Sequence, residues 1–246
     1  MSEPVSAIHD RNLIVLSAGR SGSSLLVSYL NSNRQIYCLG EVLNPGHKIY
    51  GTTEGKTREE LIRHVASFFQ TRDVTYVGAK FLTHQFDELD ITVSDVLEVL
   101  RRPKVLALYR RSLLETYVSL LIAEQTDTWY SSNVINNVSV TLDLAQFYEF
   151  AEVQRRRWED SMREVSRLCS FVCVSYEELI NDQAITMKRI FSFLDVPSAD
   201  VHCESVKQNP GDLSTKISNY DSLPRAEITA AATICLELMT DGTTSS

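Results

Sequence analysis

The sequence predicts a single α/β domain. Its 246 residues suit one sizeable domain of this class. Short apolar runs typical of buried strands recur along the chain, and stretches with helical periodicity follow them. The clearest runs are residues 13–16, 74–82, 105–109 and 170–174. We expect no internal repeat and no low-complexity segment.

Composition narrows the classes of function. The formal charge of −8 argues against non-specific binding to nucleic acid. No apolar window reaches the length of a membrane span, and residues 1–11 lack the layout of a signal peptide. The five cysteines follow no metal-ligand pattern. We therefore expect a cytoplasmic protein with reduced thiols, no metal and no membrane span.

Residues 13–41 hold the first functional pattern, a strand, a polar turn and a helix. The first N–H groups of a helix lack internal partners, and the helix dipole favours an anion there. Glycines let the turn wrap closely, and hydroxyl and guanidinium groups add donors. We predict an oxyanion cradle; the alternative is an ordinary turn with a Ser-rich N-cap. The residues concerned are Gly19, Arg20, Ser21, Gly22, Ser23 and Ser24.

The segment Arg20-Ser21-Gly22-Ser23-Ser24 resembles the phosphosulfate-binding loop of the sulfotransferases. Gly19 stands where that family usually has Pro, which affects the rigidity of the turn more than its chemistry. A Walker A loop would end in Gly-Lys-Ser/Thr, and no Lys is present here. The resemblance implies that Arg20 neutralises charge on the bridging oxygen and that Ser23 and Ser24 hold the 5′-phosphate.

A second resemblance follows the apolar run 105–109. Arg111 precedes Ser119 by eight positions, the spacing with which an Arg and a Ser of the family grip the 3′-phosphate of the nucleotide. Arg110 is the alternative for the Arg position. Basic residues at the start of a helix conflict with its dipole unless an anion lies between them.

The third resemblance is Val-x-Tyr-Glu-Glu-Leu around Tyr176, followed by Phe-Leu-x-Val-Pro at residues 193–197. In the family this Tyr lies against the adenine side of the nucleotide; packing at the sheet edge is the alternative for Tyr176. Lys207 or Lys216 could complete the 3′-phosphate site, and both are also plausible surface lysines.

Three residues are candidates for acceptor chemistry. Glu41 follows a short apolar run in a Gly-Glu context that resembles an acceptor base of some sulfotransferases. Lys80 and His84 loosely resemble the family's Lys-Thr-His element. The alternatives are a solvated loop carboxylate for Glu41, a strand-edge surface residue for Lys80 and a helix-cap or hydrogen-bonded side chain for His84. We favour Glu41 over His84 as the base.

Together the resemblances imply a three-layer sulfotransferase architecture of the P-loop type, with a central parallel sheet flanked by helices. They imply one domain over residues 1–246, with a core at 12–197 and a nucleotide-covering segment and closing helix at 198–246. The donor would be 3′-phosphoadenosine 5′-phosphosulfate, and the acceptor a hydroxyl or amine of a small molecule or carbohydrate.

Residues 126–140 would form a lid or part of the acceptor pocket, with a variable surface loop as the alternative. The competing functions are a kinase or NTPase of the P-loop type and a non-catalytic nucleotide-binding protein.

Overall fold

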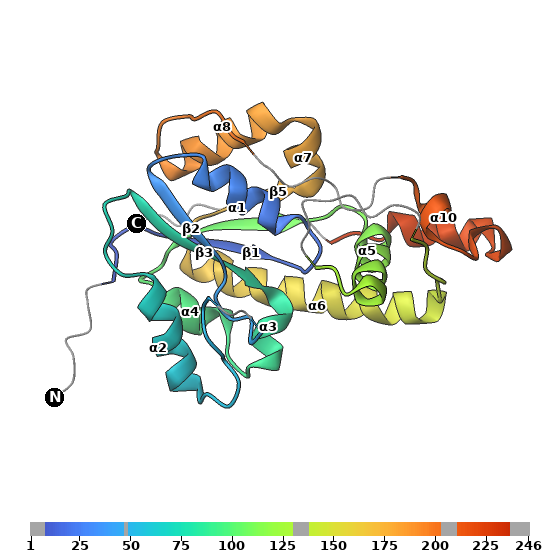
Figure 1. Cartoon of the computed structure of the whole chain (residues 1–246), viewed down its shortest axis with the longest axis horizontal. Helices are drawn as coiled ribbons and strands as arrows, with labels where there is room; N and C mark the ends of the chain where they lie inside the picture. The colour runs from blue at the N-terminus through green and yellow to red at the C-terminus, as the bar shows by residue number, and fades with distance from the viewer. Residues whose placement is uncertain (1–7, 47–48, 130–137, 203–210, 237–246) are drawn as a thin grey trace.

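The protein is built on one parallel sheet, shown in Figure 1. The computed structural model describes residues 8–46, 49–129, 138–202 and 211–236. Five strands lie in the order β2-β3-β1-β4-β5, and every neighbouring pair is parallel. The predicted α/β class is confirmed. The strands are β1 Asn12–Ser17, β2 Ile36–Glu41, β3 Tyr76–Leu82, β4 Lys104–Tyr109 and β5 Phe171–Ser175.

Helices cover both faces of the sheet, which explains why the strands are apolar throughout rather than alternating. One face packs against α1 (Ser23–Asn31), α7 (Tyr176–Asn181) and α8 (Gln183–Leu194). The other face packs against α2 (Arg58–Phe68), α3 (Thr83–Glu88), α4 (Val93–Val99) and α6 (Leu144–Leu168). Along β1, Leu13 and Val15 point to the first face, and Ile14 and Leu16 point to the second.

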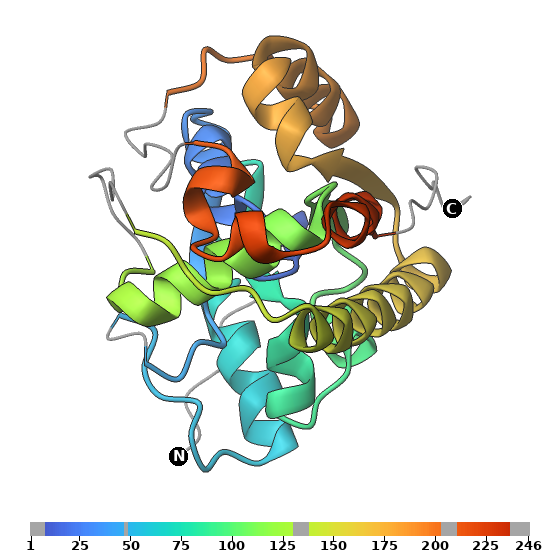
Figure 2. The same ribbon diagram turned by 90° about the vertical axis from the view of Figure 1, so that its right-hand side faces the viewer.

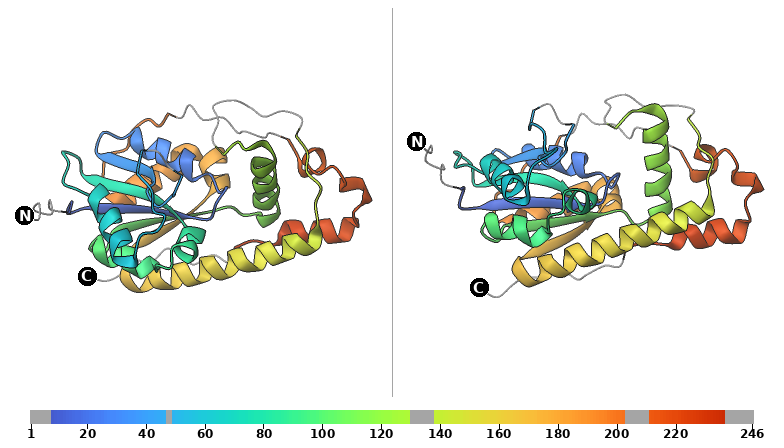
Figure 3. Two further views of the ribbon diagram at one scale, coloured as in Figure 1. Left: turned by 60° about the horizontal axis from the view of Figure 1, so that its bottom comes forward. Right: turned by 90° about the horizontal axis from the view of Figure 1, so that it is seen from below.

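An arm of helices extends beyond the carboxyl ends of the strands, as both views of Figure 3 show; in Figure 2 the arm points toward the viewer. It consists of α5 (Leu113–Thr126), α9 (Leu213–Lys216), the 3-10 helix η1 (Tyr220–Ser222), α10 (Arg225–Thr233) and the first half of α6. Helix α6 has 25 residues and runs from the arm to the underside of the sheet. The arm therefore faces the carboxyl ends of the strands.

Local signals explain most element boundaries. A Thr57–Glu60 capping box starts α2. Residues 176–181 form a short helix, which the sequence analysis did not predict, and a Ser175–Glu178 capping box starts it. The predicted closing helix ends as α10 at Thr233. In the described part of the chain, no helix is long and apolar enough to cross a membrane.

The strand order locates the ligand site. From β1 the chain first builds β2 and β3 on one side, then β4 and β5 on the other. Open α/β sheets bind ligands outside the carboxyl ends of their strands, where the strand order reverses. That position is the end of β1, where the predicted anion loop begins.

Candidate active site

The loop between β1 and α1 is a tight turn with two residues in the left-handed backbone conformation. Arg20 and Gly22 have φ of 61° and 87°, in the left-handed region. A Cβ atom on Gly22 would lie 2.4 Å from Cδ2 of Tyr176. Only glycine fits there, because both the backbone conformation and the neighbouring ring exclude a side chain.

The N-terminus of α1 lacks the side-chain cap that five other helices of the described chain have. Side chains of Thr57, Thr92, Ser112, Asp143 and Ser175 cap α2, α4, α5, α6 and α7, respectively. At α1 the N-cap residue is Gly22, and no side-chain cap bond forms within the described chain. The first turn of α1 also carries no acidic residue. Its N–H groups can therefore bind an anion.

The serines of the loop have different partners. Ser21 is fully buried, and its hydroxyl donates to the carbonyl of Ala18 at 2.7 Å, so it stabilises the turn. Ser23 is buried at the start of α1. The Oγ of Ser24 accepts a hydrogen bond from Nζ of Lys80 at 3.1 Å. Of the three predicted hydroxyls, that of Ser21 is the one committed to the protein backbone.

Arg20 and Ser119 meet across 99 positions of sequence. The Nε of Arg20 donates to Oγ of Ser119 at 3.2 Å, and a terminal nitrogen donates to the carbonyl of Trp129 at 2.9 Å. Ser119 lies on α5, which stands opposite the carboxyl ends of the strands. The structure thus brings together two residues that the sequence placed in separate motifs.

At the end of β4, Arg110 and Arg111 point to opposite sides. Leu106 and Leu108 face the α1 side of the sheet, and the buried Arg110 continues that row. Its guanidinium lies 5.0 Å from the ring centroid of Tyr176 and pairs with Glu115. Arg111 is exposed, and its side chain hydrogen-bonds to Tyr109, whose ring packs near Trp158 of α6. Arg110 therefore lies nearer the anion loop than Arg111 does.

Tyr176 lies against the loop. Its ring packs beside Gly22 on one side and under the guanidinium of Arg110 on the other. Burial raises the pKa of its phenol above the ordinary value. The ring is thus placed beside the loop, rather than simply at the edge of the sheet.

Glu41 and Lys80 form a buried ion pair beside the loop. Nζ of Lys80 lies 2.7 Å from Oε1 of Glu41, and their side chains are 4% and 8% exposed, respectively. The same ammonium reaches Ser24. The expectation of a loop carboxylate is corrected, because Glu41 is the last residue of β2, and Lys80 is no surface residue.

A β-bulge brings this pair together. Leu39 pairs with Ala79, but Glu41 pairs with Lys80, so Gly40 is an extra residue on β2. If Gly40 paired regularly with Lys80, Glu41 would be opposite Phe81 and would turn to the other face. The N–H of Gly40 donates to the hydroxyl of Tyr50 at 2.9 Å. The bulge thus aims the carboxylate at Lys80.

Asn44 is a candidate site residue that the sequence analysis did not single out. Its Nδ2 donates to Oε2 of Glu41 at 3.0 Å, and its Oδ1 accepts from the N–H of Gly46 at 3.0 Å. The second contact is an Asx turn, the usual role of Asn before Pro-Gly. That turn signal was visible in the sequence, but the contact with Glu41 depends on the tertiary fold.

His84 lies near the loop and near Glu41. Its Cε1 is 3.8 Å from the position of a Cβ on Gly19. Burial lowers the pKa of its imidazole, while Glu88 and Glu41 raise it; the net change is downward. His84 is therefore neutral at pH 7, as a proton acceptor must be.

Structure comparison gives a fold relationship. A sulfotransferase from Alicyclobacillus acidocaldarius matches with a TM-score of 0.53 and 16% identity, over 82% of this chain and 88% of that one. The fold is consistent with the sulfotransferase family. The mouse sulfotransferase SULT7A1 complexed with PAP matches at 0.47 and 16% identity, over 79% and 62% of the two chains. The sulfotransferase domain of the Synechococcus PCC 7002 olefin synthase matches at 0.47 and 17% identity, over 98% and 94%.

Sequence comparison adds no relative. No protein-family model matches this sequence, and a search of curated proteins gave no match. The likeness to sulfotransferases is thus one of fold alone. The roles of the site residues have to be argued from their geometry.

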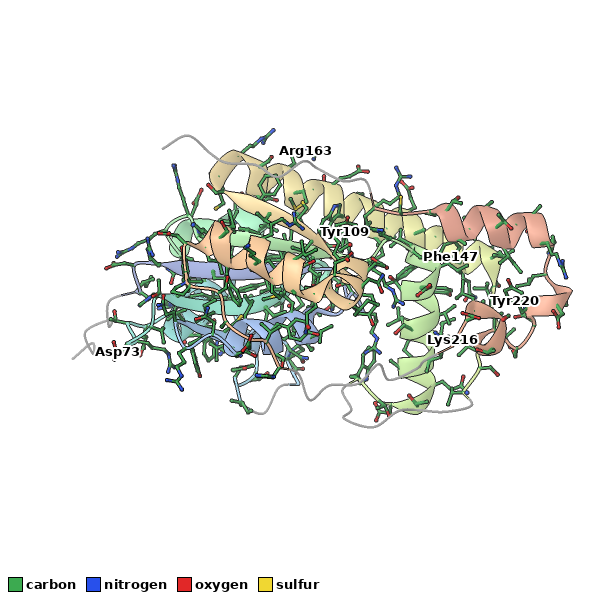
Figure 4. The ribbon with its side chains drawn as sticks, turned by 90° about the horizontal axis from the view of Figure 1, so that it is seen from above. Asp73, Tyr109, Phe147, Arg163, Lys216 and Tyr220 are labelled. Carbon is green, nitrogen blue, oxygen red and sulfur yellow. The ribbon has the colours of Figure 1, made fainter. Side chains whose placement is uncertain are left out.

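The remaining candidates lie away from the loop or outside the described chain. Lys216 is buried in α9, and Figure 4 shows it in the arm with Tyr220. Its backbone carbonyl accepts from Val140 at 2.8 Å. Lys207 and residues 130–137 of the predicted lid lie outside the described residues. Of the lid segment, the structure describes residues 126–129 and 138–140, and Trp129 is 43% exposed.

A groove of about 550 Å³ lies on the opposite face of the sheet, between α3, α4 and α6. Arg156, Arg157 and Arg163 contribute to its walls, and Figure 4 shows Arg163 on the part of α6 distant from the arm. The groove is separate from the loop site. Within the described ranges, no cluster of three or more His, Cys, Asp or Glu residues could hold a metal ion.

Proposed function

We propose that the protein is a sulfotransferase that moves a sulfuryl group from 3′-phosphoadenosine 5′-phosphosulfate to a hydroxyl or amine of a small-molecule or carbohydrate acceptor. One observation carries this proposal. Lys80 contacts both Ser24 of the anion loop and Glu41, so an anion cradle and a carboxylate share one buried ammonium. A transferase of this kind needs both within reach of the reacting atoms.

The residues present fit an anionic nucleotide. The N–H groups of α1 have no side-chain cap, and Arg20 adds a charged donor. Among the described residues, the buried Nε of Arg110 has no hydrogen-bond partner. A buried donor of this kind is costly unless a ligand satisfies it. Arg20, Ser23 and Ser24 would hold the 5′ side of the donor.

The 3′ side is assigned to Ser119 with one of the two arginines. The sequence spacing favours Arg111, whereas the side-chain directions favour Arg110. We retain Lys207 as a further candidate, with Tyr176 beside the nucleotide base. The segment that follows α8 reaches α1, where the carbonyl of His202 accepts from Ser32 at 3.2 Å. This contact lies at the C-terminal end of α1, away from the anion loop. The nucleotide-covering role of residues 198–246, within one domain, therefore rests on the sequence resemblance alone.

The donor supplies an activated sulfuryl group, and the protein supplies positioning and charge. Glu41 would accept the proton of the acceptor hydroxyl, because Lys80 favours its ionised form. Arg20 would stabilise the negative charge that collects on the bridging oxygen as its bond to sulfur breaks. Lys80 and the N–H groups of α1 would stabilise the transferring group, with His84 as the second candidate base.

The experiment is a transfer assay with the donor and a panel of hydroxylated metabolites, amines and carbohydrates, read as acceptor-dependent release of 3′-phosphoadenosine 5′-phosphate. We expect release by the wild type and a loss of about tenfold or more in Arg20→Ala. Binding of that product without transfer to any acceptor would favour a non-catalytic nucleotide-binding protein. Binding of ATP or GTP that requires Mg²⁺ would favour a kinase or NTPase.

A cytoplasmic location is part of the proposal, and the four described cysteines, all free thiols, fit it.

A further inference from the structure

The carboxylate of Glu41 is held at both oxygens. Lys80 contacts Oε1 at 2.7 Å, and Asn44 donates to Oε2 at 3.0 Å. A carboxylate offers about four lone-pair positions, so these contacts can coexist with a third, from an acceptor hydroxyl. A carboxylate with its plane fixed from two sides presents its remaining lone pairs in a fixed direction.

The orientation of the Asn44 amide follows from its two partners. Oε2 of Glu41 only accepts when ionised, so the NH₂ group must face it. The amide oxygen then faces the N–H of Gly46, as the Asx turn requires. The turn locks the amide so that its donor points at Glu41.

We propose that Asn44 is a positioning residue that orients the Glu41 carboxylate and keeps it ionised for proton transfer. This inference rests on the proposed function, in which Glu41 is the base. The N–H donation stabilises the charged form and so lowers the pKa of Glu41. Lys80 acts in the same direction from β3, whereas Asn44 acts from the loop that follows β2.

Two other titratable groups of the described chain lie near Glu41 or its partner Lys80. His84 reaches it from α3, and its own pKa is lowered, so it is neutral at pH 7. Cys38 lies near Lys80, and burial raises the pKa of its thiol to about 12, which keeps it uncharged. Of the described groups, Lys80 and Asn44 both contact the Glu41 carboxylate directly.

The substitution Asn44→Asp separates positioning from loop structure. Asp keeps the oxygen that accepts from Gly46, so the turn is retained. It removes the donor to Glu41 and places a second carboxylate beside the first. Like charges at this distance raise a pKa. If Asn44 only shapes the loop, Asp should replace it without effect.

The test follows the Glu41 carboxyl directly, by ¹³C NMR titration of protein labelled at glutamate, with the signal assigned by its loss in Glu41→Gln. We expect its pKa to rise by about one unit or more in Asn44→Asp. The acid limb of the turnover–pH profile should move upward by the same amount, with nucleotide affinity within about twofold of wild type. Gln146→Glu adds the same charge on an exposed part of α6 and should leave the titration unchanged.

Asn44→Ser provides a rescue, because a hydroxyl can donate to the carboxylate without adding charge. Its titration should lie nearer wild type than that of Asn44→Asp. An unchanged Glu41 titration in Asn44→Asp overturns the inference. A shifted titration in a protein whose wild type transfers no sulfuryl group supports the Asn44 contact and refutes the proposed function, so the two failures are distinguishable.

Discussion

The donor side and the acceptor side of the candidate site are built differently. The donor side is a contiguous loop, residues 18–24, whose groups are largely backbone N–H groups and the side chains of neighbouring residues. The acceptor side is a buried cluster from separate elements, with Glu41 on β2, Lys80 on β3 and His84 on α3. The first depends on local conformation, whereas the second depends on strand register. Perturbing the two sides should therefore have different consequences.

The largest expected effect is on stability and belongs to the acceptor side. In Lys80→Met, Glu41 would lose the buried ammonium that faces its carboxylate, and the free energy of unfolding should fall by about 3–5 kcal/mol. Urea denaturation measures this change. The double variant Lys80→Met/Glu41→Leu should recover most of the loss, while Arg20→Met on the half-buried donor side should cost about 1 kcal/mol or less. Equal losses for Lys80→Met and Arg20→Met would remove the contrast between the two sides.

The next effect is on turnover. Glu41→Gln keeps the shape and removes the basicity, so turnover should fall by about 10²-fold or more, with nucleotide affinity nearly unchanged. Steady-state kinetics with product-inhibition constants measure both quantities. His84→Asn should have a smaller effect. The base assignment reverses if His84→Asn abolishes turnover and Glu41→Gln is close to wild type.

On the donor side the change should appear in affinity. Arg20→Ala removes a charge-assisted contact, so binding of 3′-phosphoadenosine 5′-phosphate should weaken by roughly ten- to a hundred-fold, about 1.5–3 kcal/mol. Isothermal titration calorimetry measures it. Arg156→Ala, on the opposite face of the sheet, is the matched control and should bind like wild type. Unchanged affinity in Arg20→Ala would mean that the anion does not bind at this loop.

The smallest expected effect tests the 3′ side. Ser119→Ala should weaken binding by about 0.5–1.5 kcal/mol for a ligand that carries the 3′-phosphate and have no effect when that phosphate is absent. Arg110→Ala and Arg111→Ala, measured with the same two ligands, identify which guanidinium shares the phosphate. Equal sensitivity of Ser119→Ala to both ligands would instead mean that Ser119 acts through its contact with Arg20.

These differences explain which features the sequence could predict. Gly22 and the serines around it are adjacent, so their pattern was sufficient to predict a polar turn at a helix start, which the structure shows. Anion binding at this turn stays a prediction. The α/β class followed from recurring apolar strands, and the structure confirms it. The Glu41–Lys80 pair could not be predicted, because it depends on an extra residue in β2 that no periodicity marks. The directions of Arg110 and Arg111 were likewise open, because adjacent residues at a strand end point to opposite faces.

The bulge at Gly40 has a consequence for how such a site can diversify. Strand β1, which carries the donor loop, is hydrogen-bonded on both sides, so a register change there would disturb two neighbours. Strand β2 lies at the sheet edge and has β3 as its one neighbour in the described sheet. A one-residue change of register in β2 would re-aim the carboxylate and leave the central strands in register. Under the proposed function, acceptor chemistry can therefore evolve by small insertions at the edge strand of the sheet, while the proposed nucleotide-binding centre stays constant.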